Sequence, residues 1–442
     1  MAVIYLIICV ILIIFLTARW KVHPFIALLL VALAYGILSG MSFPEIIKSV
    51  NEGFGNTLGG IGLIIVLGVI IGAFLENTGG AYKIAERVLK IIGKDKVPAA
   101  MGFIGWFVSI PVFADSGFLL LSPLNKSLSK KAKISLAGSA VALALGLTAS
   151  HTLVPPTPGP IAASGILGAD LGLVLAVGIP VSIVALLAGI VYSTKFVSKT
   201  YIDPDPDIKE EDLTKLVESA PGALKSSLPV VVPIILIVIR SFLTAFEISE
   251  GFLFELFIFI GEPFIALLIG VFLSLLLPKK LDAGMLSTSG WVGKSLAASA
   301  SIILITGAGG IFGKVLQNSG IADIIGDTLA DMNLSIWLPF LIAAAIKTAQ
   351  GSSTVALITT ASIMSPIMDK LGFVDSLEKA MVVIAIGAGS AVVSHANDSF
   401  FWVITQLSGM DTKTGYRLFT PGTFVLGTTA ALTVFVLHLF LN

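Results

Sequence analysis

Two segments of this chain, LENTGGAYKIAERVLK at residues 75–90 and LQNSGIADIIGDTLAD at residues 316–331, resemble each other. They lie about 241 positions apart, one in each half of the sequence. Their charges differ in sign. The first segment and its flank carry the basic residues Lys83, Arg87, Lys90, Lys94 and Lys96. The second contains no Lys or Arg and carries the acidic residues Asp323, Asp327 and Asp331.

This charge difference predicts how the two halves lie in a membrane. Loops rich in Lys and Arg stay on the cytoplasmic side. The two segments are therefore expected on opposite sides of a bilayer, which is the pattern of an inverted repeat. Inverted repeats are typical of secondary transporters.

The composition also indicates a membrane protein. Hydrophobic residues make up 56% of the 442 residues and charged residues 12%, whereas an ordinary soluble domain has roughly 25% charged residues. The mean hydropathy is +1.01. Apolar runs long enough to cross about 30 Å of hydrocarbon occur along the whole sequence. We expect no separate soluble domain.

Other classes of protein are excluded by simple features. Residues 2–18 form an apolar run without a basic leader or a small-residue cleavage pattern, so we expect a retained first span and not a signal peptide. The single cysteine, Cys9, excludes a disulfide framework or a cysteine-based metal site within one chain. We expect no metal and no cofactor. The formal net charge of zero excludes a nucleic-acid partner, because no soluble basic face exists.

Two apolar segments, 98–121 and 334–367, are interrupted by the polar stretches IPVFADSG and IKTAQGSST. If residues 98–121 crossed the membrane completely, the next basic loop would lie outside, against the positive-inside tendency. We therefore predict two re-entrant hairpins. Ten other apolar runs are predicted to be complete spans, near residues 2–18, 23–40, 58–75, 134–165, 171–192, 229–245, 251–277, 295–316, 380–408 and 420–441.

Five spans in each half force the second half to run inverted, in agreement with the repeat. We predict an all-α polytopic membrane protein of two inverted-topology repeats, at 1–194 and 229–442, joined by a cytoplasmic linker at 195–228. Each repeat contains a re-entrant hairpin and a broken helix. Of the 27 Lys and Arg residues, this topology places only Lys48, Lys370 and Lys379 in outside loops, and leaves Arg240, Lys314 and Lys347 in or beside apolar segments.

The broken helices are expected at 134–165 and 380–408. The first contains TASHTLVPPTPGP, whose prolines interrupt a continuous helix. The second contains SHANDSFF, which is polar amid apolar sequence. Unpaired backbone groups at membrane depth are tolerated only inside protein or beside a cavity, and N–H groups at half-helix starts favour a carboxylate. The breaks and hairpin tips together predict an anion site near the midplane; the alternative is a proline kink or an extramembrane loop.

Four titratable residues at these breaks are candidates for proton coupling, namely Asp115, His151, His395 and Asp398. An ionised carboxylate near the midplane costs about 2.5 to 3.5 kcal/mol on insertion scales, so it needs a partner or a bound proton. Histidine titrates near physiological pH, and both histidines follow Ser at matching positions of the repeat. The alternatives are a solvated Asp115, an Asp398 that caps the half-helix starting at Ser399, and hydrogen-bonded core histidines.

The polar residues at the same points are candidates for substrate binding. Hydroxyl and amide groups match a polyol chain, and the Lys347 ammonium suits either a substrate carboxylate or a neighbouring Asp. A Ser or Thr in a membrane helix commonly bonds its own backbone, which is the alternative for each hydroxyl. The candidates are Ser116, Gly117, Thr152, Thr157, Lys347, Gln350, Gly351, Ser352, Ser353, Thr354, Asn397 and Ser399.

Two other features are interpreted as structural. The glycines Gly59, Gly60, Gly62, Gly68 and Gly72 are expected to permit close helix packing. Glu262, in the sequence IGEPF, is expected to mark a further helix break.

Four segments resemble the signature segments of the gluconate permease family of bacterial proton symporters. They are WFVSIPVFADSGFLLLSPL at 106–124, ASHTLVPPTPGPIAAS at 149–164, IKTAQGSSTVALITTASI at 346–363 and SHANDSFFWV at 394–403, and the similarity covers nearly the whole chain. The resemblance implies a cytoplasmic-membrane protein that imports gluconate or a related sugar acid with protons. It also implies kinship with the ion transporter superfamily, in which a transport domain moves against the scaffold of a homodimer. The family includes members for other hydroxy acids and D-serine.

We therefore expect alternating access, with the substrate carboxylate near Ser116, Gln350, Ser352 and Ser353, and its hydroxyls near Thr152, Thr157 and Asn397. Moving one net charge across the membrane costs or gains about 2.3 kcal/mol per 100 mV, so uptake of an anion into a negative interior needs accompanying protons. Sodium coupling and an anion channel are alternatives. A remote one is an intramembrane hydrolase using an adjacent Ser and His, although neighbours in one helix face different directions.

Overall fold

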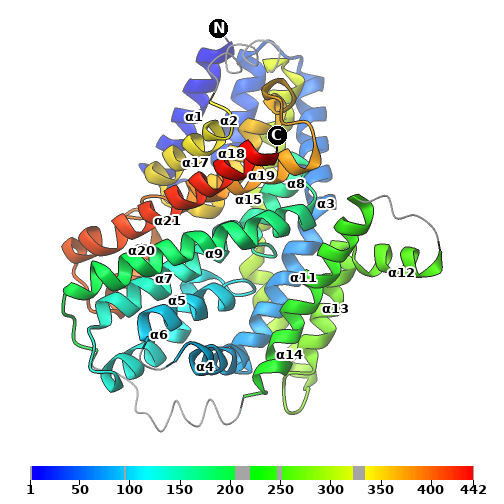
Figure 1. Cartoon of the computed structure of the whole chain (residues 1–442). Helices are drawn as coiled ribbons and strands as arrows, with labels where there is room; N and C mark the ends of the chain where they lie inside the picture. Colours follow the sequence, from blue (N-terminus) through cyan, green and yellow to red (C-terminus); the bar gives the residue numbers. More distant parts are fainter. Residues whose placement is uncertain (1, 94–95, 205–219, 246–250, 322–333, 442) are drawn as a thin grey trace.

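The computed structural model describes residues 2–93, 96–204, 220–245, 251–321 and 334–441, and the regular structure in these ranges is helical throughout (Figure 1). The prediction of an all-α chain is confirmed. The α-helices are α1 Ala2–Ala18, α2 Pro24–Leu38, α3 Phe43–Asn77, α4 Gly80–Ile92, α5 Val97–Val108, α6 Ala114–Lys131, α7 Leu136–Leu153, α8 Pro158–Leu167, α9 Leu171–Lys195, α11 Ala223–Ala245, α12 Phe252–Ile260, α13 Pro263–Leu275, α14 Ala283–Leu286, α15 Trp291–Asn318, α17 Trp337–Gln350, α18 Ser353–Met364, α19 Ser376–Ala391, α20 Ser399–Leu407 and α21 Thr412–Leu441. Short 3-10 turns occur at Val197–Lys199, Ser365–Ile367 and Asp369–Leu371.

Several of these helices have the length and apolar composition of membrane-spanning helices. In the described ranges, six helical segments are long and apolar enough to cross one, or seven if α12 and α13 count as a single span. Those two helices meet at an angle of 72°, and Glu262 lies at their junction, where a break was predicted. Fewer helices than the ten predicted spans reach this length, because α1 has 17 residues, α2 has 15, and the predicted span 380–408 is divided into α19 with 16 and α20 with 9. A straight crossing needs about 20.

The two halves present their helices in the same order. In the first half, α1, α2 and α3 precede the helical hairpin of α5 and α6, the broken helix of α7 and α8, and then α9. In the second half, α11, the α12–α13 pair and α15 precede the hairpin of α17 and α18, the broken helix of α19 and α20, and then α21. The first hairpin is longer than the predicted segment, because α6 continues to Lys131.

The repeated segments begin with the same local structure. α3 ends at Asn77 and α15 ends at Asn318, and each is followed by one right-handed residue and then by a glycine. Both glycines, Gly79 and Gly320, have φ of 72°. In the first copy the chain then continues as α4; in the second, residues 322–333 with Asp323, Asp327 and Asp331 lie outside the described ranges. Lys94 and residues 205–219 of the linker also lie outside them.

α3 and α15 pack against each other and run in opposite directions. Asn318, at the end of α15, donates from Nδ2 to Ser49 Oγ near the start of α3 at 2.8 Å. At the other end, the rings of Phe74 and Trp291 lie 5.2 Å apart, edge to face. Equivalent helices of the two halves are therefore antiparallel here.

α3 begins 15 residues before the predicted span, at Phe43. Ser42 and Glu45 form a capping box, in which the Glu45 amide donates to Ser42 Oγ and the Ser42 amide donates to Glu45 Oε2 at 3.0 Å. This motif fixes a helix start regardless of hydropathy. Lys48 consequently lies on the helix, beside Glu52 at 3.8 Å, and not in a loop as predicted.

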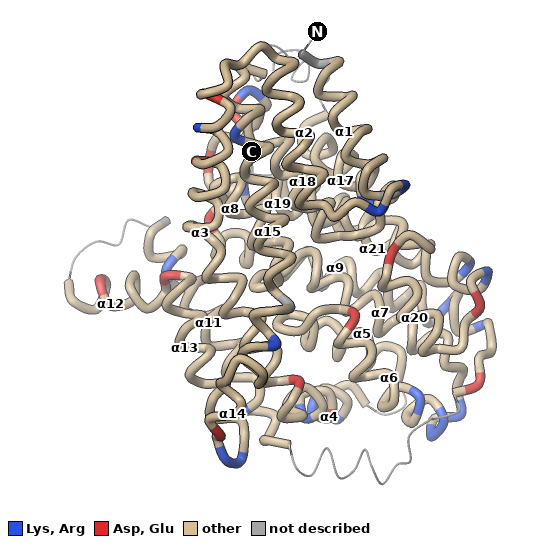
Figure 2. The backbone as a smooth tube through the Cα atoms, turned by 180° about the vertical axis from the view of Figure 1, so that it is seen from behind, with Lys and Arg blue, Asp and Glu red and all other residues tan. Residues whose placement is uncertain are grey.

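The two hairpins lie in different parts of the molecule: α17 and α18 in the upper part near the N-terminus, and α5 and α6 in the lower part (Figure 1). Figure 2 shows Lys and Arg gathered in the lower part, around α4, α14 and the end of α6.

Close packing holds the first hairpin against α3. A Cβ at Gly72 would lie 2.1 Å from the carbonyl oxygen of Pro111, and one at Gly68 would lie 3.2 Å from that of Pro156. The packing role predicted for the glycines of α3 is correct for these two. Gly59 and Gly60 have no neighbouring atom within 4 Å of such a Cβ, and Gly62 has only Leu58 of its own helix.

An ion-pair network joins α9 to α11 and the bent pair. Arg240 on α11 contacts Glu262 at 2.7 Å and Asp170, the N-cap of α9, at 3.9 Å. Ser241 also donates to Asp170 Oδ1 at 2.6 Å. Arg240 is thus paired with two protein carboxylates through its terminal nitrogens.

Candidate functional site

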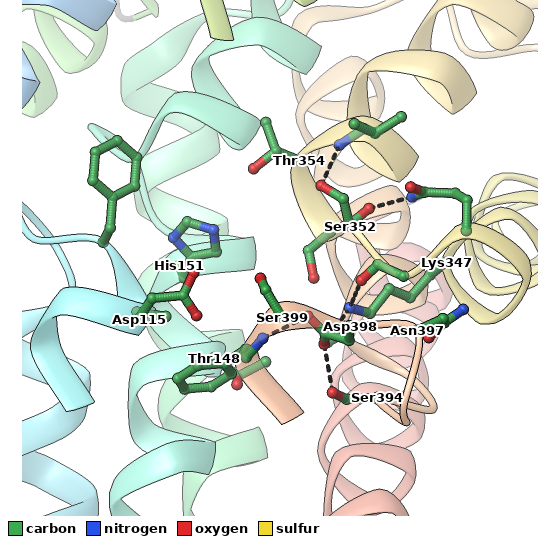
Figure 3. Close-up of a pocket in the computed structure, with 18 of the residues that line it drawn as sticks. Asp115, Thr148, His151, Lys347, Ser352, Thr354, Ser394, Asn397, Asp398 and Ser399 are labelled. Carbon is green, nitrogen blue, oxygen red and sulfur yellow. Dashed lines mark hydrogen bonds and ion pairs between the residues drawn. The ribbon is translucent and has the colours of Figure 1, made fainter. Parts of the chain in front are cut away.

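The turns of both hairpins and the break of the second broken helix surround a cavity of about 420 Å³ (Figure 3). We call it the central cavity. It also touches α7 at Thr148 and His151, and α15 at Ser301, Ile302 and Ile305. Pockets for small ligands have volumes of about 300–1,000 Å³. The central cavity is therefore large enough to hold a small organic molecule.

A buried ion pair forms one wall. Lys347 Nζ lies 2.7 Å from Asp398 Oδ2 and also donates to the carbonyl of Gly351. Only 2% of the Lys347 side chain is exposed. Ser394 Oγ donates to the same carboxylate oxygen, and Asp398 Oδ1 accepts from the amide of Phe400 at 3.0 Å. Asp398 thus caps α20, as the alternative prediction had it, while also neutralising Lys347.

Asp115 lies on the opposite side of the cavity and differs from Asp398. It belongs to the first turn of α6 and is exposed to the cavity. Among the described residues, no Lys, Arg or His forms a salt bridge with it. Figure 3 shows Asp115 beside His151, facing the region of Ser399. The cavity therefore contains one paired and one unpaired carboxylate.

Three half-helices begin at the central cavity. α6 starts at Ala114 without a side-chain cap, α18 starts after Ser352, and α20 starts after Asp398. The amide of Val355 donates to Ser352 Oγ at 3.3 Å. The fourth half-helix, α8, begins at Pro158 and borders a different, smaller cavity. Helix N-termini favour anions, because their first N–H groups lack helical partners.

The turn of the second hairpin depends on Gly351. Its φ is +95°, and a Cβ at this position would lie 2.2 Å from the carbonyl oxygen of Asn397. A glycine is therefore needed for the left-handed turn and for the contact with the broken helix. Gln350 Nε2 donates to the carbonyl of Ser352 across the same turn.

Two buried polar atoms of the lining have no hydrogen-bond partner within the described ranges. They are His151 Nδ1 and Asn397 Oδ1. The other end of Asn397 is fixed, because Nδ2 donates to the carbonyl of Thr348 at 2.8 Å. Buried polar groups are nearly always paired, so these two atoms are unused hydrogen-bonding groups in the cavity wall.

Most of the predicted site residues line the central cavity. They are Asp115, His151, Lys347, Gln350, Gly351, Ser352, Ser353, Thr354, Asn397, Asp398 and Ser399.

The remaining predicted residues lie elsewhere. Ser116 lines a separate cavity and Thr157 the small one beside α8. Gly117 packs against Leu147, which a Cβ would meet at 2.7 Å. Thr152 is buried and donates to the carbonyl of Thr148 at 3.0 Å. His395 donates from Nε2 to the carbonyl of Thr348 at 2.8 Å and is not part of the lining.

Sequence reasoning missed several lining residues. Phe113 and Ser394 adjoin predicted residues, so the motifs already contained them. Thr148 lies about one helical turn before His151, a spacing that places both on one face of α7. Ser301, Ile302 and Ile305 carried no such signal, because they belong to an uninterrupted apolar helix.

The chain matches the family model of the GntP family permeases over residues 1–440. It belongs to the GntP permease family. It is 34% identical to the gluconate permease of Pseudomonas aeruginosa, over 96% of this chain and 95% of that protein. It is 35% identical to the inner membrane permease YgbN of Escherichia coli, over 96% and 95%. It is 31% identical to the D-serine transporter DsdX of Escherichia coli, over 98% and 97%.

A solved structure shares the fold of this GntP family member. The Alcanivorax borkumensis YdaH transporter is similar with a TM-score of 0.67 at 13% identity, over 95% of this chain and 99% of that one. Together, family and fold identify a multi-pass inner-membrane transporter and exclude an enzyme. The local geometry agrees, since Ser394 bonds Asp398 and His395 bonds Thr348, so the two do not form a nucleophile–base pair.

Proposed function

We propose that this permease imports gluconate or a closely related sugar acid together with protons, by alternating access around the central cavity. The observation that carries the proposal is the charge of the lining. Its charged residues are Lys347, Asp115 and Asp398, so with His151 neutral the cavity has a formal net charge of minus one. A second anion is unfavourable there until a carboxylate is protonated. Binding of a proton and of the substrate anion are thereby coupled.

Asp115 is the group we assign to the proton. Asp398 is held by Lys347, by Ser394 and by the start of α20, and an ionised carboxylate suits all three contacts. Asp115 is bonded by the hydroxyl of Ser399 but has no cationic partner among the described residues, and it faces the cavity. His151 is the second candidate because Nδ1 is unpaired beside the cavity. His395 is the weakest, since its Nε2–H is already bonded to backbone.

The remaining lining suits a hydroxylated acid. The uncapped start of α6 and the hydroxyls at the start of α18 offer hydrogen bonds to a carboxylate. Asn397 Oδ1 and His151 Nδ1 accept from substrate hydroxyls. Both kinds of group lie around one space of about 420 Å³.

We also propose the membrane arrangement expected from the sequence. The antiparallel packing of α3 and α15, their matching Asn and Gly termini, and the common order of helices support two inverted repeats. In this arrangement α5–α6 and α17–α18 are re-entrant hairpins that enter from opposite sides. The protein would work as a homodimer whose scaffold stays fixed while the hairpin-bearing domain moves.

The test is uptake of labelled D-gluconate into proteoliposomes under an imposed inward proton gradient without sodium. We expect accumulation above equilibrium that collapses when a protonophore is added. No accumulation under any proton gradient, but accumulation with sodium, would reject proton coupling. Equilibration without accumulation would indicate a channel.

D-serine is the second candidate substrate, because the chain is also similar to the D-serine transporter DsdX. D-serine is a zwitterion, so its uptake needs no compensating proton for charge alone. Competition of unlabelled D-serine and of sugar acids against labelled gluconate separates the two candidates. Stronger inhibition by D-serine than by unlabelled gluconate or any other sugar acid would replace the proposed substrate.

A further inference from the structure

A second polar cavity of about 290 Å³ lies beyond the first hairpin. It is bordered by Glu76 and Asn77 at the end of α3, by Ser116 on α6, and by Trp291, Lys294 and Ser295 at the start of α15. None of these six residues lines the central cavity. We call it the α3–α15 cavity.

The α3–α15 cavity lies on the side of the molecule that carries α4 and α14. α4 follows the end of α3, and α14 precedes the start of α15, and both helices lie at the bottom of Figure 1. Lys and Arg gather in this part of the chain (Figure 2). By the positive-inside tendency this is the cytoplasmic side.

Phe113 separates the two cavities. It borders both, and it also borders a third space of about 10 Å³ between them, together with Pro111, Val112 and His151. Such a space holds about one water molecule at most. This space is therefore too small for an organic anion. The neighbouring residues Asp115 and Ser116 line different cavities, so the hairpin turn forms the partition.

The α3–α15 cavity has the chemistry of a weak anion site. Lys294 is exposed, and within the described ranges its ammonium forms no salt bridge. It lies in the first turn of α15, which no side chain caps at Gly290, so the partial positive charge of the helix start adds to that of the ammonium. Ser116 adds a hydroxyl. Glu76 opposes these groups, because its carboxylate borders the same cavity and repels an anion.

We propose that the α3–α15 cavity is a second binding site for the transported carboxylate, through which the anion passes between the central cavity and the cytoplasm. Lys294 binds the carboxylate there. The proposal rests on the proposed function, since it takes the same sugar acid as its ligand. The carboxylate of Glu76 at the same cavity makes binding of an anion weak, as release into the cytoplasm requires.

The chain offers a direct test, because Cys9 is its only cysteine and is buried. In a Cys9→Ala background, Ala73→Cys places a thiol in the α3–α15 cavity, and Ile302→Cys places one in the central cavity as the matched control, at a residue with no proposed hydrogen bond to the substrate. Inside-out vesicles are treated with a membrane-impermeant thiol reagent, with and without D-gluconate. We expect the reagent to label Ala73→Cys, and gluconate to slow labelling at both positions. Lys294→Gln should raise the gluconate concentration that half-protects Ala73→Cys about tenfold and leave protection of Ile302→Cys unchanged.

The outcomes distinguish the two proposals. Protection of Ile302→Cys alone, or protection of Ala73→Cys that Lys294→Gln does not weaken, overturns the second site and leaves the proposed function intact. Protection of neither thiol overturns the substrate assignment and the second site with it. Labelling of Ala73→Cys only from the external side overturns its place on the cytoplasmic path.

Discussion

Asp115 and Asp398 both place a carboxyl group in the central cavity, but the residues around the two groups differ. We expect Asp115→Asn to abolish gluconate accumulation driven by a proton gradient, because an amide cannot bind and release the coupling proton in the cavity. Exchange of labelled for unlabelled gluconate across the membrane should persist, since exchange needs no net proton movement. Accumulation and exchange are measured with the same preparation of proteoliposomes.

Asp398→Asn is the contrasting variant. It removes the partner of a Lys347 side chain that is only 2% exposed, and breaking a buried pair in this way costs about 3–5 kcal/mol. The expected result is a lower unfolding temperature in detergent, whereas Asp115→Asn should unfold like the parent. Proton-driven accumulation by Asp115→Asn at the parental level would transfer the coupling role to His151.

At the scale of residues, the sequence predicted which polar residues lie near the site better than it predicted the directions in which their side chains face. The polar motifs correctly named Asp115, Lys347 and Asn397 among the residues now found in the cavity wall. It grouped Ser116 with them, but adjacent residues of a helix point about 100° apart, and Ser116 faces the α3–α15 cavity. Ser301 could not be predicted from the sequence, because only tertiary packing brings this part of α15 to the site.

At the scale of elements, the contact between α3 and the first hairpin gives a second prediction. A Cβ on Gly72 would overlap a backbone oxygen, at 2.1 Å, which no side-chain movement can relieve. We expect Gly72→Ala to destabilise the protein by about 1–3 kcal/mol and to slow transport by displacing the turn at Phe113. Thermal unfolding and initial uptake rates measure the two effects.

The matched control is Gly60→Ala on the same helix, where nothing lies within 4 Å of the added carbon. Alanine favours a helix over glycine by about 0.5–1 kcal/mol, so this variant should be unchanged or slightly more stable. Equal effects of the two substitutions would show that helix propensity, and not the hairpin contact, governs position 72.

Element boundaries were predictable where a specific motif was read, and missed where hydropathy alone was used. The prolines of residues 155–160 correctly placed the break between α7 and α8. The start of α3 was missed because residues 43–57 are too polar for a span, although the Ser42–Glu45 capping box was present in the sequence. Polar helical extensions leave no mark in a hydropathy profile.

At the scale of the molecule, the prediction concerns which side each part faces. In the Cys9→Ala background, Arg87→Cys on α4 and Val374→Cys before α19 both place thiols on exposed positions. Inverted repeats predict that an impermeant reagent labels Arg87→Cys only from the cytoplasmic side and Val374→Cys only from outside. Labelling of both from one side would contradict the inverted arrangement but not the helical fold.

The paired turns at Asn77–Gly79 and Asn318–Gly320 have a consequence for how such a protein can be redesigned. In both copies the glycine after the helix end has a φ of 72°. In the proposed inverted arrangement, the charges expected to set orientation in the membrane occupy other positions of the same segments, such as Arg87 and Asp327. The glycines of the helix junction and the residues expected to orient the protein are therefore different residues. Exchange of the charges on α4 is thus expected to change the orientation of the protein in the bilayer without altering the helix junction.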